Sequence, residues 1–173
     1  MTHVPLAWPL VDFAIRMREN YPKIIFDTAF DPRMTKYAIV TKLGLDSRPL
    51  SDEEQEMSAG LGVYINEMWI VHKNLPKWTI HVKRNNIRVI DVFRWIYDDF
   101  SQPLTRQELV EIGPEYLQRC RPSFEQRCRD APSWQHVEER KGVLRVDLLR
   151  GKRRFVGLQP LPGQPATYEL LLD

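Results

Sequence analysis

The fold is decided by residues 64–83, which read YINEMWIVHKNLPKWTIHVK. The two ends of this stretch are rich in β-branched and aromatic residues, and its middle, residues 72–77, contains the Asn and Pro that are typical of a turn. In residues 78–83 apolar side chains alternate with polar ones, so one face of the strand is apolar and the other is exposed to solvent. The pattern predicts a β-hairpin with strands over residues 64–71 and 78–83.

Helical signals follow the hairpin. In residues 87–100 apolar side chains recur at the three- and four-residue spacing of a helix, and Asp91 is predicted as its N-cap. Thr105 and Glu108 form a capping box, which predicts the start of a second helix. A third helix is predicted over residues 114–129, with a break or bend at its internal proline.

The C-terminal part is predicted to be β-structure. Residues 143–149, 154–158 and 167–172 are β-like stretches separated by turns, which is typical of a meander. The order along the chain is therefore a hairpin, then helices, then a meander. Elements segregated in this way predict the α+β class, with a mainly antiparallel sheet (central hairpin plus C-terminal meander) and helices packed on one face.

The length fits one domain. The chain has 173 residues, and domains usually have about 100–200. We interpret residues 1–23 as an N-terminal segment and residues 24–173 as a single α+β domain. Within this domain, residues 34–62 are an atypical insert, whose short helix begins at the capping box of Ser51 and Glu54.

Composition excludes several classes of protein. Apolar residues make up 43% and charged residues 28% of the chain, as in ordinary soluble globular proteins. The longest run without a charge, residues 155–168, is rich in Gly, Pro and Gln, so we expect no transmembrane helix. The N-terminus lacks the features of a secretory signal, and two cysteines without any Asn-x-Ser/Thr sequon fit a reducing compartment. We therefore expect a cytoplasmic or nuclear protein.

Spaced motifs within residues 24–172 point to a known family. They are Leu75-Pro76-x-Trp78-Thr79-Ile80, Val89-x-Asp91-Val92, Arg145-Val146-Asp147-Leu148-Leu149 and Arg154-Phe155-Val156-Gly157-Leu158. With these motifs the chain resembles a domain family of unknown function that is abundant in mushroom-forming (basidiomycete) fungi. The resemblance implies a fungal origin and a compact single domain. It implies no activity and no catalytic residue.

A small set of residues are weak candidates for catalysis. They are Cys120, Cys128, His72, His136, Arg145 and Asp147. Arginines flank both cysteines, which favours a lowered thiol pKa, and a histidine could then act as the base. The alternative is that both cysteines are small core residues whose arginine neighbours point to solvent. The arginine and the aspartate share one face of a predicted strand, either as a structural salt bridge or at the mouth of a groove.

The sequence gives no sign of a metal or a cofactor. We find no motif for nucleotide hydrolysis, zinc binding or calcium binding. The four histidines do not have the spacing of metal ligands. We therefore expect no metal site and no cofactor.

Two surfaces are candidates for binding. Trp95 falls off the apolar stripe of its helix, so we expect an exposed aromatic anchor with Arg94 beside it; the alternative is that it packs under the N-terminal segment. The second surface is a cation cluster on a predicted turn, which could bind phosphate or an acidic partner or only solubilise a hairpin tip. The cluster consists of Arg150, Lys152, Arg153 and Arg154.

Positive charge is concentrated in one segment. The net charge of the whole chain is only +2, but residues 119–154 contain 11 basic and 5 acidic side chains. Because basic segments attract phosphate groups, this segment could bind nucleic acid. The alternative is a charged helix and turn that face water.

These observations favour a non-catalytic protein-interaction or regulatory module, with an unknown protein as partner and no contact with a membrane. A second hypothesis is a small enzyme or small-ligand binder with a pocket between sheet and helices. The third is nucleic-acid binding through residues 119–154. A concave pocket with a buried His or Cys would favour the enzyme, a flat apolar patch near Trp95 a protein partner, and a continuous basic stripe nucleic acid.

Overall fold

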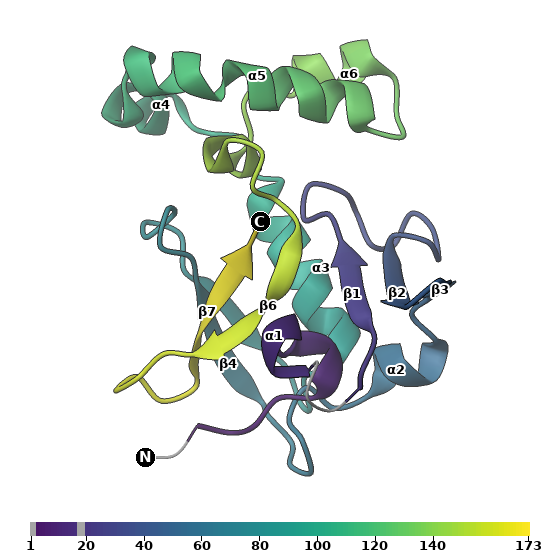
Figure 1. Ribbon diagram of the computed structural model, residues 1–173. Coiled ribbons are helices and arrows are strands. Elements are labelled where there is room, and N and C mark those ends of the chain that lie inside the picture. Colours follow the sequence, from purple (N-terminus) through teal and green to yellow (C-terminus); the bar gives the residue numbers. More distant parts are fainter. Residues whose placement is uncertain (1–2, 17–19) are drawn as a thin grey trace.

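The computed structural model describes residues 3–16 and 20–173. Two sheets contact one central helix, α3 (Val89–Phe100), and the helices α4, α5 and α6 form a separate layer above this body in the view of Figure 1. Four of the five strand pairings are antiparallel. The predicted α+β class with mainly antiparallel pairing is confirmed.

The N-terminal segment packs on the body. It contains a 3₁₀ turn, η1 (Trp8–Leu10), and a short helix, α1 (Phe13–Arg16). Leu10 is fully buried. The Tyr168 hydroxyl donates a hydrogen bond of 2.9 Å to the carbonyl of Val4. This segment therefore lies against the C-terminal part of the chain.

The first sheet has three antiparallel strands. Strand β1 (Lys23–Phe26) pairs with β2 (Ile39–Leu43), which pairs with β3 (Asp46–Pro49). The short helix α2 (Asp52–Glu56) follows. Residues 34–62 thus supply two of the three strands of this sheet as well as the predicted short helix.

The second sheet has four strands in the order β5-β4-β7-β6. Strands β4 (Glu67–Val71) and β5 (Ile80–Lys83) form the predicted central hairpin. Strands β6 (Phe155–Pro160) and β7 (Thr167–Leu172) form a second hairpin. Because β4 and β7 run parallel, this sheet is mixed.

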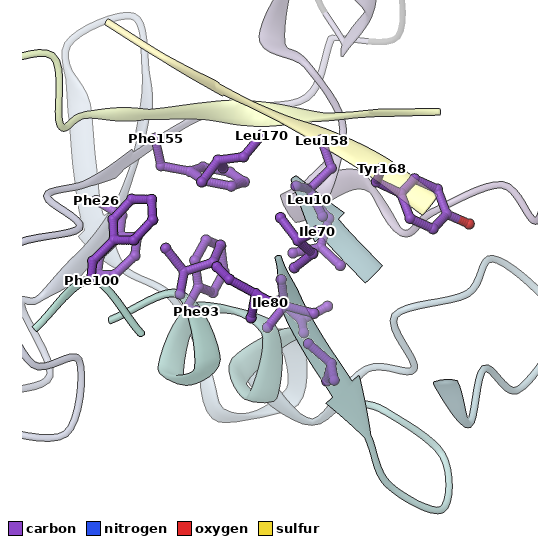
Figure 2. Packing of buried hydrophobic residues seen from close by; sticks show 14 of the residues in the cluster. Leu10, Phe26, Ile70, Ile80, Phe93, Phe100, Phe155, Leu158, Tyr168 and Leu170 are labelled. Carbon is purple, nitrogen blue, oxygen red and sulfur yellow. The ribbon is translucent and has the colours of Figure 1, made fainter. Parts of the chain in front are cut away.

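The core lies between the two sheets and α3. The ring of Phe93, on α3, packs edge-on against Phe26 of the first sheet and Phe155 of the second, with centroid distances of 5.1 and 5.0 Å. Figure 2 shows these rings with the surrounding aliphatic side chains. The apolar stripe predicted for this helix is buried at Val89, Phe93, Ile96 and Phe100.

Most of the predicted helix starts agree with the structure. Both predicted capping boxes are present: Ser51 with Glu54 at α2, and Thr105 with Glu108 at α4. The prediction that Asp91 is an N-cap is wrong. It is the third residue of α3, and its carboxylate accepts a hydrogen bond of 2.9 Å from the backbone N–H of the residue before the helix.

The helical layer contains three helices, α4 (Arg106–Ile112), α5 (Pro114–Asp130) and α6 (Gln135–Arg140). The chain turns between α4 and α5 at Gly113, whose φ of +86° lies in the region that favours glycine. Helix α5 runs on through Pro122 without a break. No helix in the described part of the chain is long and apolar enough to span a membrane.

The strand predicted over residues 143–149 is wrong. Arg145–Leu149 form a 3₁₀ helix, η3, so the C-terminal β-structure is a hairpin and not a three-stranded meander. Val146 and Leu148 alternate as in a strand, but Leu149 is buried as well. Buried neighbours three residues apart fit a 3₁₀ helix, whose side chains repeat every third residue.

Candidate functional site

A groove lies beside α5, between the β4–β5 loop and the helical layer. Two adjoining cavities of about 320 and 430 Å³ share Asn74, Tyr116 and Leu148, and so form one continuous feature, which we call the α5 groove. The remaining lining residues are Leu75, Pro76, Lys77, Trp78, Glu108, Glu111 and Ile112 at one end, and Leu149, Arg150 and Lys152 at the other.

The acidic end of the groove is neutralised from within. The Trp78 indole N–H donates to the Glu108 carboxylate at 3.2 Å, and Lys77 pairs with Glu111 at 2.6 Å. The Glu108 carboxylate also accepts a hydrogen bond from the backbone N–H of Thr105. This hydrogen bond is the main cause of the lowered pKa of Glu108. Both carboxylates therefore already have donors on this chain.

The middle of the groove is apolar and rigidly held. Its floor contains Leu148 and Leu149 of η3, both almost completely buried. The Tyr116 hydroxyl donates a hydrogen bond of 2.8 Å to the Leu148 carbonyl, which ties α5 to η3. A tyrosine phenol is protonated at neutral pH, and burial raises the pKa of Tyr116 further, so this bond is kept.

The basic end of the groove has free cations. Arg150 and Lys152 are exposed, and neither forms an ion pair within the described part of the chain. Arg150 has a φ of +54° and caps the C-terminus of η3, a left-handed position where glycine is preferred. An arginine in this conformation costs roughly 1 kcal/mol or more. The chain thus keeps a strained cation at the groove.

The predicted pair of Arg145 with Asp147 does not form. The Asp147 carboxylate binds Arg127 through two hydrogen bonds of 2.8 and 3.0 Å. Arg145 pairs instead with Asp99 at 2.6 Å, and its guanidinium lies 5.0 Å from the centre of the Trp78 ring. The strand interpretation had placed the two residues on one face, whereas η3 directs them to different partners.

Arg127 is the centre of a buried polar cluster that the sequence did not reveal. The residue is only 1% exposed, and its side chain contacts Asp147, Glu138 at 3.3 Å and the carbonyl of Gly142 at 3.0 Å. Burial alone would lower its pKa, but the hydrogen bonds and charge of Asp147 outweigh burial and raise it. The cluster joins α5, α6 and η3, and the expectation that the arginines beside the cysteines all point to solvent is wrong.

The cysteines and histidines do not form a catalytic arrangement. Cys120 and Cys128 are buried, and burial raises the pKa of both thiols, so the predicted lowering is wrong. His72 is buried at the end of β4, and burial lowers its pKa. His136 is exposed on α6. Within residues 3–16 and 20–173, no hydrogen bond or ion pair joins a histidine to either cysteine, and no group of three or more possible metal ligands occurs.

The cation cluster of the predicted turn is divided between two roles. Arg153 is half-buried and bonds Asp27 at 2.8 Å and Asp130 at 2.7 Å, so it links the residue that follows β1 to the end of α5. Arg154 is exposed just before β6. The other two members, Arg150 and Lys152, line the α5 groove. Only part of this cluster is therefore available to a partner.

The basic segment as a whole is largely occupied by internal ion pairs. Six of the eleven basic side chains in residues 119–154 bind a carboxylate of this chain. Among them are the buried Arg127 and the half-buried Arg145 and Arg153. These cations satisfy carboxylates of the fold, so the free positive charge is confined to a few positions.

Trp95 is half-buried and packs against the core, so it does not protrude as a free aromatic anchor. Its neighbour Arg94 is also half-buried, and the Nε atom of Arg94 is buried without a hydrogen-bond partner. The two residues that the sequence grouped together are therefore both half-buried, but Trp95 makes apolar contacts whereas the Arg94 Nε has no hydrogen-bond partner among the described residues.

Comparison with known proteins adds one finding. A family model described as "Family of unknown function (DUF6699)" matches residues 24–167. No curated protein and no solved structure matches the chain.

Proposed function

Because the chain belongs to DUF6699, a family of unknown function, we propose its function from the α5 groove: the protein is an interaction module that binds a short segment of a partner protein. The segment carries an apolar side chain, which enters the middle of the groove, and an acidic side chain, which pairs with Arg150 and Lys152. The setting that we propose from the sequence is the cytoplasm or nucleus of a fungal cell.

The apolar middle supports binding of a side chain. Trp78, Ile112, Tyr116 and Leu148 lie on different elements and line one concavity. An apolar side chain that enters it leaves water and gains about 25 cal/mol for each Å² of apolar surface buried. Since the Tyr116–Leu148 hydrogen bond holds the walls in place, little ordering entropy opposes binding.

The charge asymmetry determines which segment fits, and it is the observation that carries the proposal. The carboxylates at one end have donors on this chain, whereas the cations at the other end form no ion pair with any described residue. A carboxylate bound there gains charge-assisted hydrogen bonds without breaking an existing ion pair. An acidic side chain is therefore favoured over a basic one.

The conformation of Arg150 is an independent argument. Backbone strain of this kind persists when the surrounding structure imposes it, and it concentrates at binding sites. A glycine would satisfy the same cap without strain, yet the chain places at this position the cation that lines the groove.

A displayed library of random peptides provides the first test. The immobilised domain is expected to select peptides in which an apolar residue lies close to Asp or Glu. The same selection on an Arg150→Glu variant should lose these peptides, because the variant repels a carboxylate. Selection of basic peptides, or of peptides without a common pattern, would contradict the proposal.

The binding site is then located by NMR with a selected peptide. Amide shifts are expected to change at residues 74–78, 112–116 and 148–152. Lys152→Ala should weaken binding about tenfold, as expected for loss of one charge-assisted contact, whereas Arg140→Ala, an exposed cation of α6, should not. Shifts confined to another face of the protein would show a binding module with a different site.

A further inference from the structure

Another cavity shares no lining residue with the α5 groove. It has a volume of about 430 Å³ and lies between residues 32–36, α2 and α3. Arg94, Lys36 and Arg33 contribute cationic groups to its lining, and Met34, Ile39 and Ile90 contribute apolar ones. We call it the Arg94 pocket.

Arg94 differs from every comparable arginine of the described chain. Among the arginines of residues 3–16 and 20–173 whose side chains the structure describes, five are at least partly buried: Arg88, Arg94, Arg127, Arg145 and Arg153. Four of them bind a carboxylate. The Arg94 side chain forms no ion pair or hydrogen bond within these residues, and its Nε is buried without a partner, as is the Nε of Arg145.

An unpaired cation in this position is costly, because burial removes water that would otherwise solvate it. Nε and one Nη of an arginine together form a flat pair of donors that fits two oxygens of one oxyanion. The absence of a bond at the buried Nε leaves one of these two donors without a protein acceptor. An oxyanion in the pocket would supply the charge partner that this guanidinium lacks.

The other charges of the pocket also favour an anion. Lys36 is exposed and forms no ion pair within the described residues. Arg33 pairs with both Asp31 and Asp98. Asp52, at the first position of α2, is the acidic residue of the lining. Among the lining residues, three cations face one carboxylate, because the two carboxylates that bind Arg33 lie outside the lining.

We propose that the Arg94 pocket binds a small phosphate monoester. Arg94 binds phosphate oxygens through its guanidinium, and Lys36 adds a second cation. The apolar part of the ester contacts Met34, Ile39 and Ile90. This site is separate from the proposed peptide groove and does not depend on it.

Phenyl phosphate is the probe, because it combines a phosphate monoester with a small apolar group. Titration of the intact chain, followed by amide NMR, is expected to shift residues 33–36 and the amide of Arg94. Arg94→Gln should weaken binding about tenfold to a hundredfold, as expected for loss of charge-assisted hydrogen bonds. Arg140→Gln is the matched control and should bind like the unaltered protein.

Two further measurements separate binding from a structural role. Arg94→Gln should unfold at the same urea concentration as the unaltered protein or at a higher one, because no ion pair is lost. Arg94→Lys keeps the charge but not the flat donor pair, and should bind more weakly than the unaltered protein and more tightly than Arg94→Gln. Phenol, which has no phosphate, should leave the pocket amides unchanged.

The proposal is overturned if phenyl phosphate does not bind, if Arg94→Gln binds it as well as the unaltered protein, or if phenol causes the same shifts. Shifts that occur only around Arg150 and Lys152 would overturn it too, because they would place the phosphate at the α5 groove.

Discussion

The body and the helical layer of this protein are held together by different forces. In the body, α3 and the two sheets bury a continuous apolar core that includes Phe26, Phe93 and Phe155. In the layer, which lies above the body in Figure 1, α4 has no buried residue, and the buried residues of α5 and α6 are Cys120, Arg127, Cys128 and Glu138.

This difference shows how the two parts respond to substitution. Apolar stabilisation is distributed over many contacts, so a small change in the body costs a small amount. A buried charge is stable only when its partners are all present, so the layer depends on a few polar atoms. The α5 groove contains residues of both parts, and its shape therefore depends on how the layer is attached.

The largest expected effect comes from breaking the polar cluster. Asp147→Ala leaves Arg127 buried without its main partner and should lower the free energy of unfolding by about 3–5 kcal/mol. Urea denaturation measures this change, and hydrogen exchange should show the greatest loss of protection in α5 and α6. The control is Glu125→Ala, which removes an exposed pair with Arg121 on the same helix and should cost about 0.5 kcal/mol or less. Equal costs for the two variants would contradict the comparison.

A conservative core change should have a smaller effect that is spread over the molecule. Ile96→Val removes one buried methylene group from α3 and should cost about 1 kcal/mol. Hydrogen exchange should increase evenly across α3 and both sheets. If the increase occurred only in the helical layer, the body would not be the cooperative unit that we describe.

Sequence reasoning succeeded where the determining contacts are local. The β4–β5 hairpin followed from alternation within a few residues, and both capping boxes join residues three positions apart. It failed at η3, because alternation of Val146 and Leu148 is compatible with either a strand or a 3₁₀ turn.

The candidate sites were less accessible to sequence reasoning. Arg127 and Asp147 are twenty positions apart, and nothing local shows that they meet. The sequence grouped Arg150 and Lys152, which line the α5 groove, with Arg153, whose internal pairing depends on tertiary contacts. The Nε of Arg94 has no hydrogen-bond acceptor among the described residues. Which groups surround it depends on the folded chain, so this too could not be predicted from the sequence.

The next effect concerns the junction between layer and body. Arg150→Gly relieves the left-handed strain but adds the larger backbone entropy of glycine in the unfolded chain, so we expect a net gain of about 0.5 kcal/mol. Binding of a selected peptide should fall at the same time. Lys152→Gly is the control: it should weaken binding without the gain in stability. A loss of stability in Arg150→Gly would show that the arginine supports the fold.

The smallest effect should appear on acidification. Burial would raise the pKa of Glu138, but hydrogen bonds from Lys141 and Ser133 outweigh burial and lower it below the usual value of 4.5. The stability from this carboxylate is therefore complete above pH 4.5 and is lost as the pH falls through the lowered pKa. Amide NMR between pH 6 and pH 3.5 should show α6 loosening before α3, and Glu138→Gln should reduce this difference. Simultaneous loosening of both helices would contradict the prediction.

The position of β7 has a consequence for how the chain is made. This strand lies between β4 and β6 in the sheet, and its parallel partner β4 is synthesised about a hundred residues earlier. During translation, the β4–β5 hairpin and α3 emerge from the ribosome with one edge of the sheet uncovered. Because such edges pair readily with other chains, the nascent protein is exposed to aggregation until residue 172 has emerged.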